Sequence, residues 1–309
     1  MYALRLHDRN GPQSIVYEQA PTPSPGIGDV LVRVQAASFT PTELSWPSTW
    51  VDRNGHDRRP VIPGHEVSGV VEALGYGTSG LGVGQAVFGI TDWYRDGAAA
   101  EFVAVEARNL ALKPPAVSHP VAASCALAGL TAWQALFDHG GLARGQTVLI
   151  HGAAGGVGSL AVQLAHATGA RVIGTGHGWA QPLVAELGAD QFIDMTSERF
   201  EDAVTSVDVV LDLVGGDVLA RSLHVLKSGG VLVSAVAMPD QRALRADVRA
   251  TFFVVEANRQ LLTELAELLV SGALKPILGA LAPLAEGRAS FQAKQQGGTR
   301  GKTVLEVAA

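Results

Sequence analysis

The segment Thr147–Ser159 constrains the fold of this chain more than any other feature. It reads Thr-Val-Leu-Ile-His-Gly-Ala-Ala-Gly-Gly-Val-Gly-Ser, and an apolar helical pattern follows through His166. A strand, a glycine-rich turn and a helix in this order form the loop that binds the pyrophosphate of a dinucleotide. Gly155 and Gly156 let backbone N–H groups approach a pyrophosphate, and the helix N-terminus adds partial positive charge. The segment therefore predicts a dinucleotide-binding fold.

The residues after this loop repeat the alternation of strand and helix. Apolar runs predict four further strands, at 171–175, 191–193, 207–212 and 230–236, with helical segments at 182–187 and 218–226. Continuous apolar strands that alternate with helices indicate a parallel sheet buried on both faces. A core strand and turn without a nucleotide would explain one such segment, but five in succession favour the nucleotide-binding interpretation.

Composition excludes several classes of function. The chain has 309 residues, of which 47% are hydrophobic and 17% charged, and its formal net charge is −6. These values are typical of a globular protein of two domains, and the negative charge argues against a nucleic-acid or anionic-membrane partner. The single cysteine fits a reducing compartment. Because the N-terminus lacks a signal-peptide pattern and no uninterrupted apolar run is long enough to span a bilayer, we expect a soluble, cytoplasmic protein.

The first part of the chain has a different pattern. Alternating apolar and polar residues at 30–35, 69–74 and 99–105, separated by Gly and Pro turns, predict an antiparallel, barrel-like domain. The segment 301–307 is expected to be a strand that returns to this domain. An amphipathic helix is expected at 258–271, with one apolar face formed by Leu261, Leu262, Leu265, Leu268 and Leu269.

Several of these segments together carry a family resemblance. They are Gly145-Gln146, Leu149, Ala153–Gly158 and Gln163, with His166 in place of a closing basic residue, and the blocks 63–71, 127–133 and 300–305. In these residues the chain resembles the medium-chain dehydrogenase/reductases, in their zinc-independent quinone oxidoreductase (ζ-crystallin-like) branch. The resemblance implies an α/β protein with a GroES-like β-barrel catalytic domain at 1–120 and 257–309. It also implies a Rossmann domain, a doubly wound parallel sheet, at 121–256, with the active site in the cleft between the two.

Many relatives are zinc alcohol dehydrogenases, so the family's metal ligands need separate treatment. This chain keeps Gly64-His65-Glu66 but has Phe39–Glu43 where the family's first cysteine ligand lies. Its only cysteine, Cys125, lies in an apolar helical stretch, which favours a buried side chain. We therefore expect no metal site, with His65 and Glu66 holding the wall of the cleft.

Without zinc there is no Lewis acid to polarise an alcohol or a simple ketone. Quinones and α,β-unsaturated carbonyls accept hydride without one, because conjugation spreads the developing charge. We therefore expect an enzyme that reduces a small-molecule quinone or enone. Two alternatives stay open: an enoyl reductase of polyketide or secondary metabolism, and a non-enzymatic NADPH-binding sensor.

The predicted cofactor is NADPH rather than NADH. In an NAD site an acid near the end of the second strand bonds the ribose 2′-hydroxyl, and here that strand runs into Thr175-Gly-His177-Gly-Trp179 without an acid. Thr175 and His177 are candidate donors to a 2′-phosphate. Arg300 or Lys302 from the C-terminal strand are further candidates. The alternative is that His177 and Trp179 do not contact a cofactor and only cap a loop.

The resemblance extends the cofactor site to residues outside the glycine loop. Thr131 corresponds to a threonine on the nicotinamide side, and Lys302 to a residue near the phosphates, although a packing role competes for each. The expected cofactor-binding set is Thr131, Ala154, Gly155, Gly156, Val157, Gly158, Thr175, His177, Leu213, Val214, Gly215, Ala235, Val236, Phe253, Val254, Arg300 and Lys302.

The substrate residues are the least constrained. Thr40 stands where relatives carry Asn, and Trp46, Trp50 and Tyr94 are aromatic residues in expected loops that would stack on a flat quinone or serve as hydrophobic cover. Thr40 and Tyr94 are the candidate catalytic residues. We further expect a homodimer, because relatives commonly pair through the outer strand of the Rossmann sheet, for which Leu226–Ala237 is apolar enough.

Overall fold

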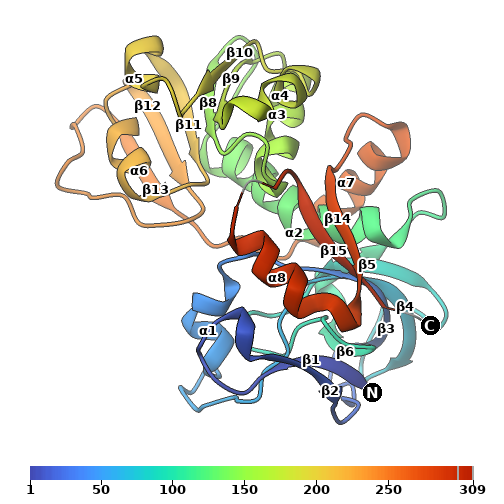
Figure 1. Ribbon diagram of the computed structural model, residues 1–309. Coiled ribbons are helices and arrows are strands. Elements are labelled where there is room, and N and C mark those ends of the chain that lie inside the picture. Colours follow the sequence, from blue (N-terminus) through green and yellow to red (C-terminus); the bar gives the residue numbers. More distant parts are fainter. Residues whose placement is uncertain (298, 308–309) are drawn as a thin grey trace. The chain divides into compact units, whose positions relative to one another are not determined.

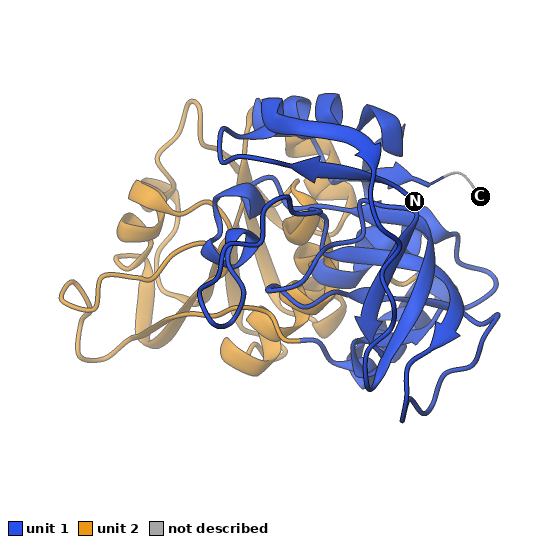
Figure 2. Cartoon of the chain, turned by 90° about the horizontal axis from the view of Figure 1, so that it is seen from below, with its two compact units in different colours: residues 1–127, 257–272, 276–309 blue, residues 128–256, 273–275 orange. Residues whose placement is uncertain are grey.

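The computed structural model describes residues 1–297 and 299–307, and the chain divides into two compact units (Figure 2). Unit 1 comprises 1–127, 257–272 and 276–309, and unit 2 comprises 128–256 and 273–275. The predicted boundary after residue 120 falls near the start of helix α2 (His119–Trp133), whereas the observed division lies inside this helix. Unit 2 is a single insertion into unit 1, apart from the short segment 273–275.

Unit 2 is built on a parallel sheet of six strands (Figure 1). The strands are β8 (Thr147–His151), β9 (Arg171–Gly176), β10 (Gln191–Asp194), β11 (Val207–Asp212), β12 (Leu226–Ser234) and β13 (Arg249–Phe252). Their spatial order is β10-β9-β8-β11-β12-β13, and every neighbouring pair is parallel. This is the doubly wound order in which the chain reverses direction across the sheet between β8 and β11. The five strands predicted from the sequence are confirmed.

The predicted outer strand of this sheet is wrong. We expected Leu226–Ala237 to form the edge, but β12 pairs on its far side with β13, and β13 is the edge strand. The sequence did not indicate β13 because its four residues, Arg-Ala-Thr-Phe, are partly or fully exposed and carry no apolar run. An edge strand is paired with a neighbour on one side only, so it does not need an apolar run.

The helices of unit 2 connect these strands. They are η4 (Gln134–His139), α3 (Gly156–Thr168), η5 (Gly178–Ala180), α4 (Gln181–Glu186), α5 (Phe200–Ala203) and α6 (Gly216–Ser222). Helix α3 ends at Thr168 and is capped by Gly169, whose φ of 82° is the left-handed conformation that glycine adopts without strain. The helix predicted at 218–226 ends earlier, because β12 already begins at Leu226.

Unit 1 contains a seven-stranded sheet and a separate two-stranded sheet. The larger sheet has the order β14-β15-β3-β4-β5-β7, with β6 also paired to β3. Its strands are β3 (Asp29–Ser38), β4 (Glu66–Leu74), β5 (Ala86–Ile90), β6 (Phe102–Glu106), β7 (Leu110–Leu112), β14 (Leu278–Pro283) and β15 (Lys302–Glu306), and the smaller sheet pairs β1 (Tyr2–Leu6) with β2 (Ile15–Gln19). The pairing is antiparallel except between β14 and β15. The antiparallel character expected for this part of the chain is confirmed.

The C-terminal strand returns to unit 1 as predicted. Val304 of β15 pairs with Ser38 of β3, although the two residues are far apart in the sequence. The core behind these strands is apolar and includes two stacked aromatic rings, Phe39 and Phe291, whose centroids are 3.6 Å apart. This pairing gives β15 a fixed register beside the residues that follow β3.

The helices of unit 1 are short except for α2 and α7. They are η1 (Pro12–Ser14), η2 (Glu43–Ser45), α1 (Pro47–Trp50), η3 (Ala107–Asn109), α7 (Arg259–Ser271), η6 (Leu284–Glu286) and α8 (Gly287–Gln295). The Asn258 side chain caps α7 by accepting a hydrogen bond from the Leu261 N–H, and Leu261, Leu262 and Leu265 are buried. The amphipathic helix predicted at 258–271 is confirmed.

The stretch His119–His139 corrects one expectation about apolar runs. By length and composition it is able to cross a membrane, but 78% of its apolar window is buried inside the protein. A buried core helix has the same composition as a membrane span, so this observation is weak evidence for a membrane. Cys125 is fully buried within this stretch, as predicted.

Candidate functional site

The glycine loop lies where β8 passes into α3. Gly155 is the N-cap residue of α3, with extended backbone, and the helix begins at Gly156. A Cβ atom on Gly158 would approach the carbonyl oxygen of Gly152 to well under 3.0 Å and would lie 2.9 Å from the Ala153 Cα. Only glycine allows this close packing of the helix on the turn. The first turn of a helix has N–H groups without intrahelical partners and carries partial positive charge, so this end of α3 favours an anion.

The sheet order brings a second predicted loop beside this one. Strands β8 and β11 are adjacent, with Leu211 opposite Ile150, so the turns after both strands lie at the point where the strand order reverses. A Cβ atom on Gly152 would contact the side chains of Leu213 and Val214 at 3.6 and 3.5 Å. In open parallel sheets, ligands bind outside the carboxyl ends of the strands at such a reversal.

The turns that follow β12 and β13 lie along the same edge of the sheet, at the carboxyl ends of the strands. Gly215 lies beside Val236, because a Cβ atom on Gly215 would be 3.1 Å from the Val236 Cγ1. The Phe253 N–H donates to the Ser234 carbonyl, and the Phe253 ring lies 4.6 Å from the His139 ring. Large apolar side chains are exposed along this edge, namely Trp179, Val214, Val236, Met238 and Val254. Exposed apolar side chains concentrated at one edge indicate a ligand-binding surface.

A buried carboxylate that the sequence analysis did not single out holds two of these turns. Oδ1 of Asp212 accepts hydrogen bonds from the N–H groups of Val214 and Gly215, at 3.1 and 2.9 Å, and Oδ2 accepts one from the Ser234 hydroxyl at 2.8 Å. The Ser234 oxygen in turn accepts hydrogen bonds from the N–H groups of Val236 and Ala237. The signal for this role was an Asp at the end of an apolar strand directly before a Gly-Gly turn.

The end of the second strand contains the residues predicted to face a 2′-phosphate. Thr175 is buried, and its hydroxyl lies 2.9 Å from Nδ1 of His151 inside the unit. Its place on a strand of a parallel sheet that is covered on both faces accounts for this burial, and its predicted contact with a phosphate stays a prediction. His177 and Trp179 are both exposed in the turn that follows β9.

Three other predicted cofactor residues have mixed environments. Ala154 and Thr131 are buried, the latter in α2, whereas Ala235 is partly exposed after β12. The contacts of these residues with a cofactor stay predictions. The structure brings the predicted segments 154–158, 213–215 and 235–236 together along one edge of one sheet.

In unit 1, the predicted substrate segment is anchored by a buried carboxylate. Glu43 accepts hydrogen bonds from the N–H groups of Gly64 and Thr40, at 2.6 and 3.1 Å. Burial raises the pKa of Glu43 to about 7. The side chain therefore ties the loop after β3 to the Gly64-His65 turn, and it holds the candidate catalytic residue Thr40 in place.

Aromatic rings surround His65. The centroid of the Trp46 ring lies 6.3 Å from that of the His65 ring. The centroid of the Trp93 ring lies 5.1 Å from that of His65 and 5.5 Å from that of Trp46. Nδ1 of His65 lies 2.7 Å from the Thr91 hydroxyl, and burial lowers the pKa of His65 to about 4. The imidazole is thus neutral at physiological pH. Trp93 was not predicted, because a lone tryptophan in a loop carries no motif.

The other two aromatic candidates have different surroundings. Trp50 is only 3% exposed, and its indole N–H donates to the Leu44 carbonyl. The ring is therefore almost wholly buried against unit 1, and its predicted contact with a substrate stays a prediction. Tyr94 is half-buried, and the Arg53 guanidinium lies over its ring at 4.9 Å.

The two C-terminal cations lie in unit 1. The Lys302 ammonium is buried in an ion pair with Glu66 and donates to the Phe39 carbonyl at 3.0 Å. Arg300 is exposed. The structure gives Lys302 a structural contact across β3, β4 and β15, and its predicted contact with a phosphate stays a prediction. Glu66 therefore has a structural contact inside unit 1, and its expected place in the wall of a cleft stays a prediction.

The residues present do not fit a catalytic zinc ion. Within residues 1–297 and 299–307, no group of three His, Cys, Asp or Glu side chains is arranged to hold a metal ion. Burial, followed by the charge of Glu66, raises the pKa of the Cys125 thiol to about 12.

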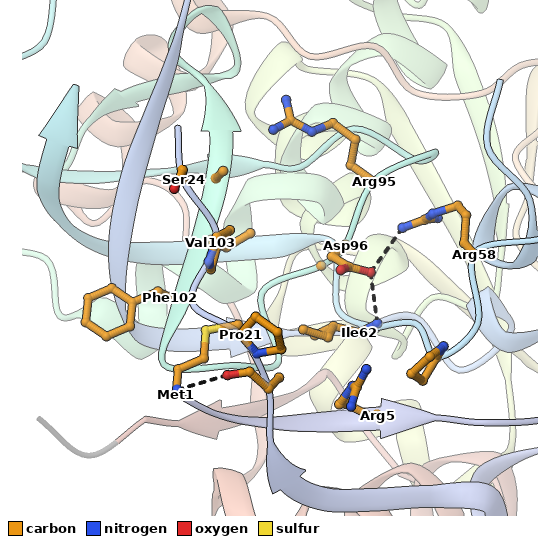
Figure 3. Close-up of a pocket in the computed structure, with 15 residues that line it drawn as sticks. Met1, Arg5, Pro21, Ser24, Arg58, Ile62, Arg95, Asp96, Phe102 and Val103 are labelled. Atoms are coloured by element: carbon orange, nitrogen blue, oxygen red, sulfur yellow. Dashed lines mark hydrogen bonds and ion pairs between the residues drawn. The ribbon is translucent and has the colours of Figure 1, made fainter. Parts of the chain in front are cut away.

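The hollow drawn in Figure 3 is a separate feature of unit 1. It has a volume of about 550 Å³ and is lined by Arg5, Arg58 and Arg95 among other residues. Each guanidinium is paired with a carboxylate: Arg5 with Glu18, Arg58 with Asp96, and Arg95 with Asp29 and Glu106. Because these charges are balanced and the hollow contains none of the predicted site residues, we do not assign the site to it.

A second hollow in unit 1, of about 680 Å³, lies beside the predicted substrate segment. Thr42, Ser45, Trp50 and Lys294 are among the residues that line it. Burial lowers the pKa of Lys294 to about 8, and its ammonium donates to the Gly301 carbonyl at 2.7 Å. The hollow therefore borders the same loop that Glu43 anchors.

Comparison with known proteins supports the fold of both units. Residues 26–115 match the alcohol dehydrogenase GroES-like domain, and residues 187–305 match the zinc-binding dehydrogenase family. The 2-methylene-furan-3-one reductase of Solanum lycopersicum is 35% identical over 294 residues, which cover 89% of this chain and 71% of the relative. The chloroplastic NADPH-dependent alkenal/one oxidoreductase of Arabidopsis thaliana is 32% identical over 291 residues, with the same two coverages.

A solved structure gives the same result for the whole chain. The quinone oxidoreductase from Coxiella burnetii superposes with a TM-score of 0.94 at 32% identity, covering 100% of this chain and 99% of that one. The GroES-like and Rossmann folds expected from the sequence are thereby confirmed. The chain belongs to the medium-chain dehydrogenase/reductase superfamily, as an oxidoreductase of its quinone oxidoreductase-like branch.

Proposed function

We propose that this protein reduces a quinone or an α,β-unsaturated carbonyl with NADPH and without zinc. The observation that carries the proposal is the glycine cradle of α3, which lies at the strand-order reversal of a six-stranded parallel sheet and is bordered by exposed apolar side chains. The named activities of the relatives, an NADPH-dependent alkenal/one oxidoreductase and a quinone oxidoreductase, support it.

Each part of unit 2 has a distinct task in this proposal. The backbone N–H groups of Gly156, Val157 and Gly158 bind the pyrophosphate at the helix N-terminus. Val214 and Val236 provide apolar surface beside the adenosine and the nicotinamide. His177 is the donor available to a 2′-phosphate in the turn after β9. The cofactor, when bound, supplies the hydride.

In unit 1 the proposed substrate surface is the aromatic cluster of Trp46 and Trp93. A flat conjugated ring stacks favourably on tryptophan. His65 is neutral and already bonded to Thr91, so its role in this proposal is to hold the two indole rings rather than to transfer a proton. Conjugated substrates fit a site of this kind, because they accept hydride without a Lewis acid.

The test is a measurement of NADPH and NADH consumption against quinones, enones, simple alcohols and aldehydes, with added zinc and with a chelator. We expect faster oxidation of NADPH with a quinone or an enone, at a rate that the chelator does not change. Alcohol oxidation that a chelator abolishes would refute the proposal. Tight NADPH binding without turnover of any acceptor would instead favour a sensor.

We also propose that the protein forms a homodimer through β13, the edge strand of the parallel sheet. The free side of an edge strand offers unpaired N–H and carbonyl groups to a second copy. Light scattering at micromolar concentration tests this: twice the mass of the chain is expected, and a monomer would refute it.

A further inference from the structure

The end of the third strand brings a carboxylate to the turn where the cofactor ribose is expected. Strands β9 and β10 are parallel neighbours, and Asp194 pairs in register with Gly176. A Cβ atom on Gly178 would approach Oδ2 of Asp194 to well under 3.0 Å and would lie 3.1 Å from its Cγ. The acid that is missing after the second strand is therefore present in space, supplied by the third strand.

This carboxylate is ionised and has no cation beside it. Oδ1 accepts hydrogen bonds from the Thr196 N–H at 2.9 Å and from the Thr196 hydroxyl at 2.7 Å. These bonds hold the pKa of Asp194 below its usual range. Within the part of the chain that the structure describes, Asp194 makes no ion pair. Its negative charge therefore acts on whatever binds at the turn 177–179.

The position of the charge has a consequence for cofactor choice. In doubly wound nucleotide-binding sheets, the adenosine ribose lies at the end of the second strand, and an acid there bonds the 2′-hydroxyl and repels a 2′-phosphate. We propose that Asp194 is a specificity-determining residue that limits the preference for NADPH over NADH. The inference rests on the proposed use of a nicotinamide cofactor. Both cofactors are then accepted, with NADPH favoured only modestly.

The experiment measures the dissociation constants of NADP⁺ and NAD⁺ by calorimetry, for the wild type and for Asp194→Asn. A single negative charge beside a doubly charged phosphate changes the affinity in water by about tenfold. Asp194→Asn is therefore expected to tighten NADP⁺ relative to NAD⁺ by about tenfold. Glu186→Gln, on the exposed last turn of α4, removes the same charge elsewhere in unit 2 and is expected to leave the ratio unchanged.

A third variant separates charge from the shape of the turn. Asp194→Glu alters the turn but keeps the negative charge, so its ratio of dissociation constants is expected to stay near that of the wild type. Equal shifts in Asp194→Asn and Asp194→Glu, or no shift in Asp194→Asn, would overturn this inference and leave the proposed function standing. Binding of neither nucleotide by the wild type would overturn both.

Discussion

The substitution Gly158→Ala tests the packing of the glycine loop most directly. The added Cβ would come closer to the Gly152 carbonyl oxygen than real Cβ atoms do, and it would lie 2.9 Å from the Ala153 Cα. Both partners are backbone atoms, so the clash is relieved only if the N-terminus of α3 moves away from the turn. Overpacking of this kind costs about 1–3 kcal/mol.

The expected loss is measurable in two ways. A cost of about 2 kcal/mol lowers the Tm of a domain of about 150–250 residues by about 4–8 °C. The same displacement moves the first-turn N–H groups away from the pyrophosphate, so the Kd for NADP⁺ rises by at least about tenfold. Thermal unfolding by circular dichroism and calorimetric titration measure these two effects.

Gly155→Ala is the matched control. Its Cβ would lie 3.2 Å from the Gly152 carbonyl oxygen, and the backbone of Gly155 is extended, so a shift of a few tenths of an ångström accommodates the methyl group. Its Tm is expected to fall less than that of Gly158→Ala. A Gly158→Ala variant with the Tm and the nucleotide affinity of the wild type would refute the reasoning.

Three further predictions concern buried groups. Because the pKa of Glu43 rises from 4.5 to about 7, its folded form binds more protons than the unfolded form. The unfolding free energy of the wild type, measured relative to Glu43→Gln by urea titration, should therefore fall by up to about 3 kcal/mol as the pH rises from 4.5 to about 7. A difference between the two unfolding free energies that does not change with pH would contradict this. Cys125, with a pKa of about 12, should not react with an aromatic disulfide reagent at pH 8 until urea unfolds the chain, so rapid native labelling would contradict its burial. Ser234→Ala leaves Oδ2 of Asp212 without its 2.8 Å partner and should cost about 1–3 kcal/mol in thermal unfolding, whereas an unchanged Tm would contradict a stabilising role for the bond between Ser234 and Asp212.

The local patterns of the sequence determined the class of fold. Five strands of the parallel sheet, helix α3 and helix α7 were predicted because each carries its own signal: a continuous apolar run, a glycine turn, or leucines at helical spacing. The edge strand β13 was missed because four partly exposed residues give no such signal. Each of these signals depends only on residues that are close together along the chain, so it can be read from the sequence alone.

The composition of the candidate site depended on contacts between distant residues. The sequence indicated that no acid follows β9, yet the pairing of β9 with β10 brings Asp194 to that turn. It also indicated Thr175 and Trp50 as ligand contacts, but it did not show that Thr175 lies against His151 or that the Trp50 indole donates a hydrogen bond to the Leu44 carbonyl. Asp212 and Trp93 acquired their roles from Ser234 and His65, to which no sequence motif connects them.

The sequence by itself thus determined that a dinucleotide loop exists, because one continuous segment contains the strand, the glycines and the helix. Only the tertiary structure decided which charges and rings surround it. The physical reason is that strand order and register set those neighbours, and both follow from packing of the whole sheet rather than from any one segment.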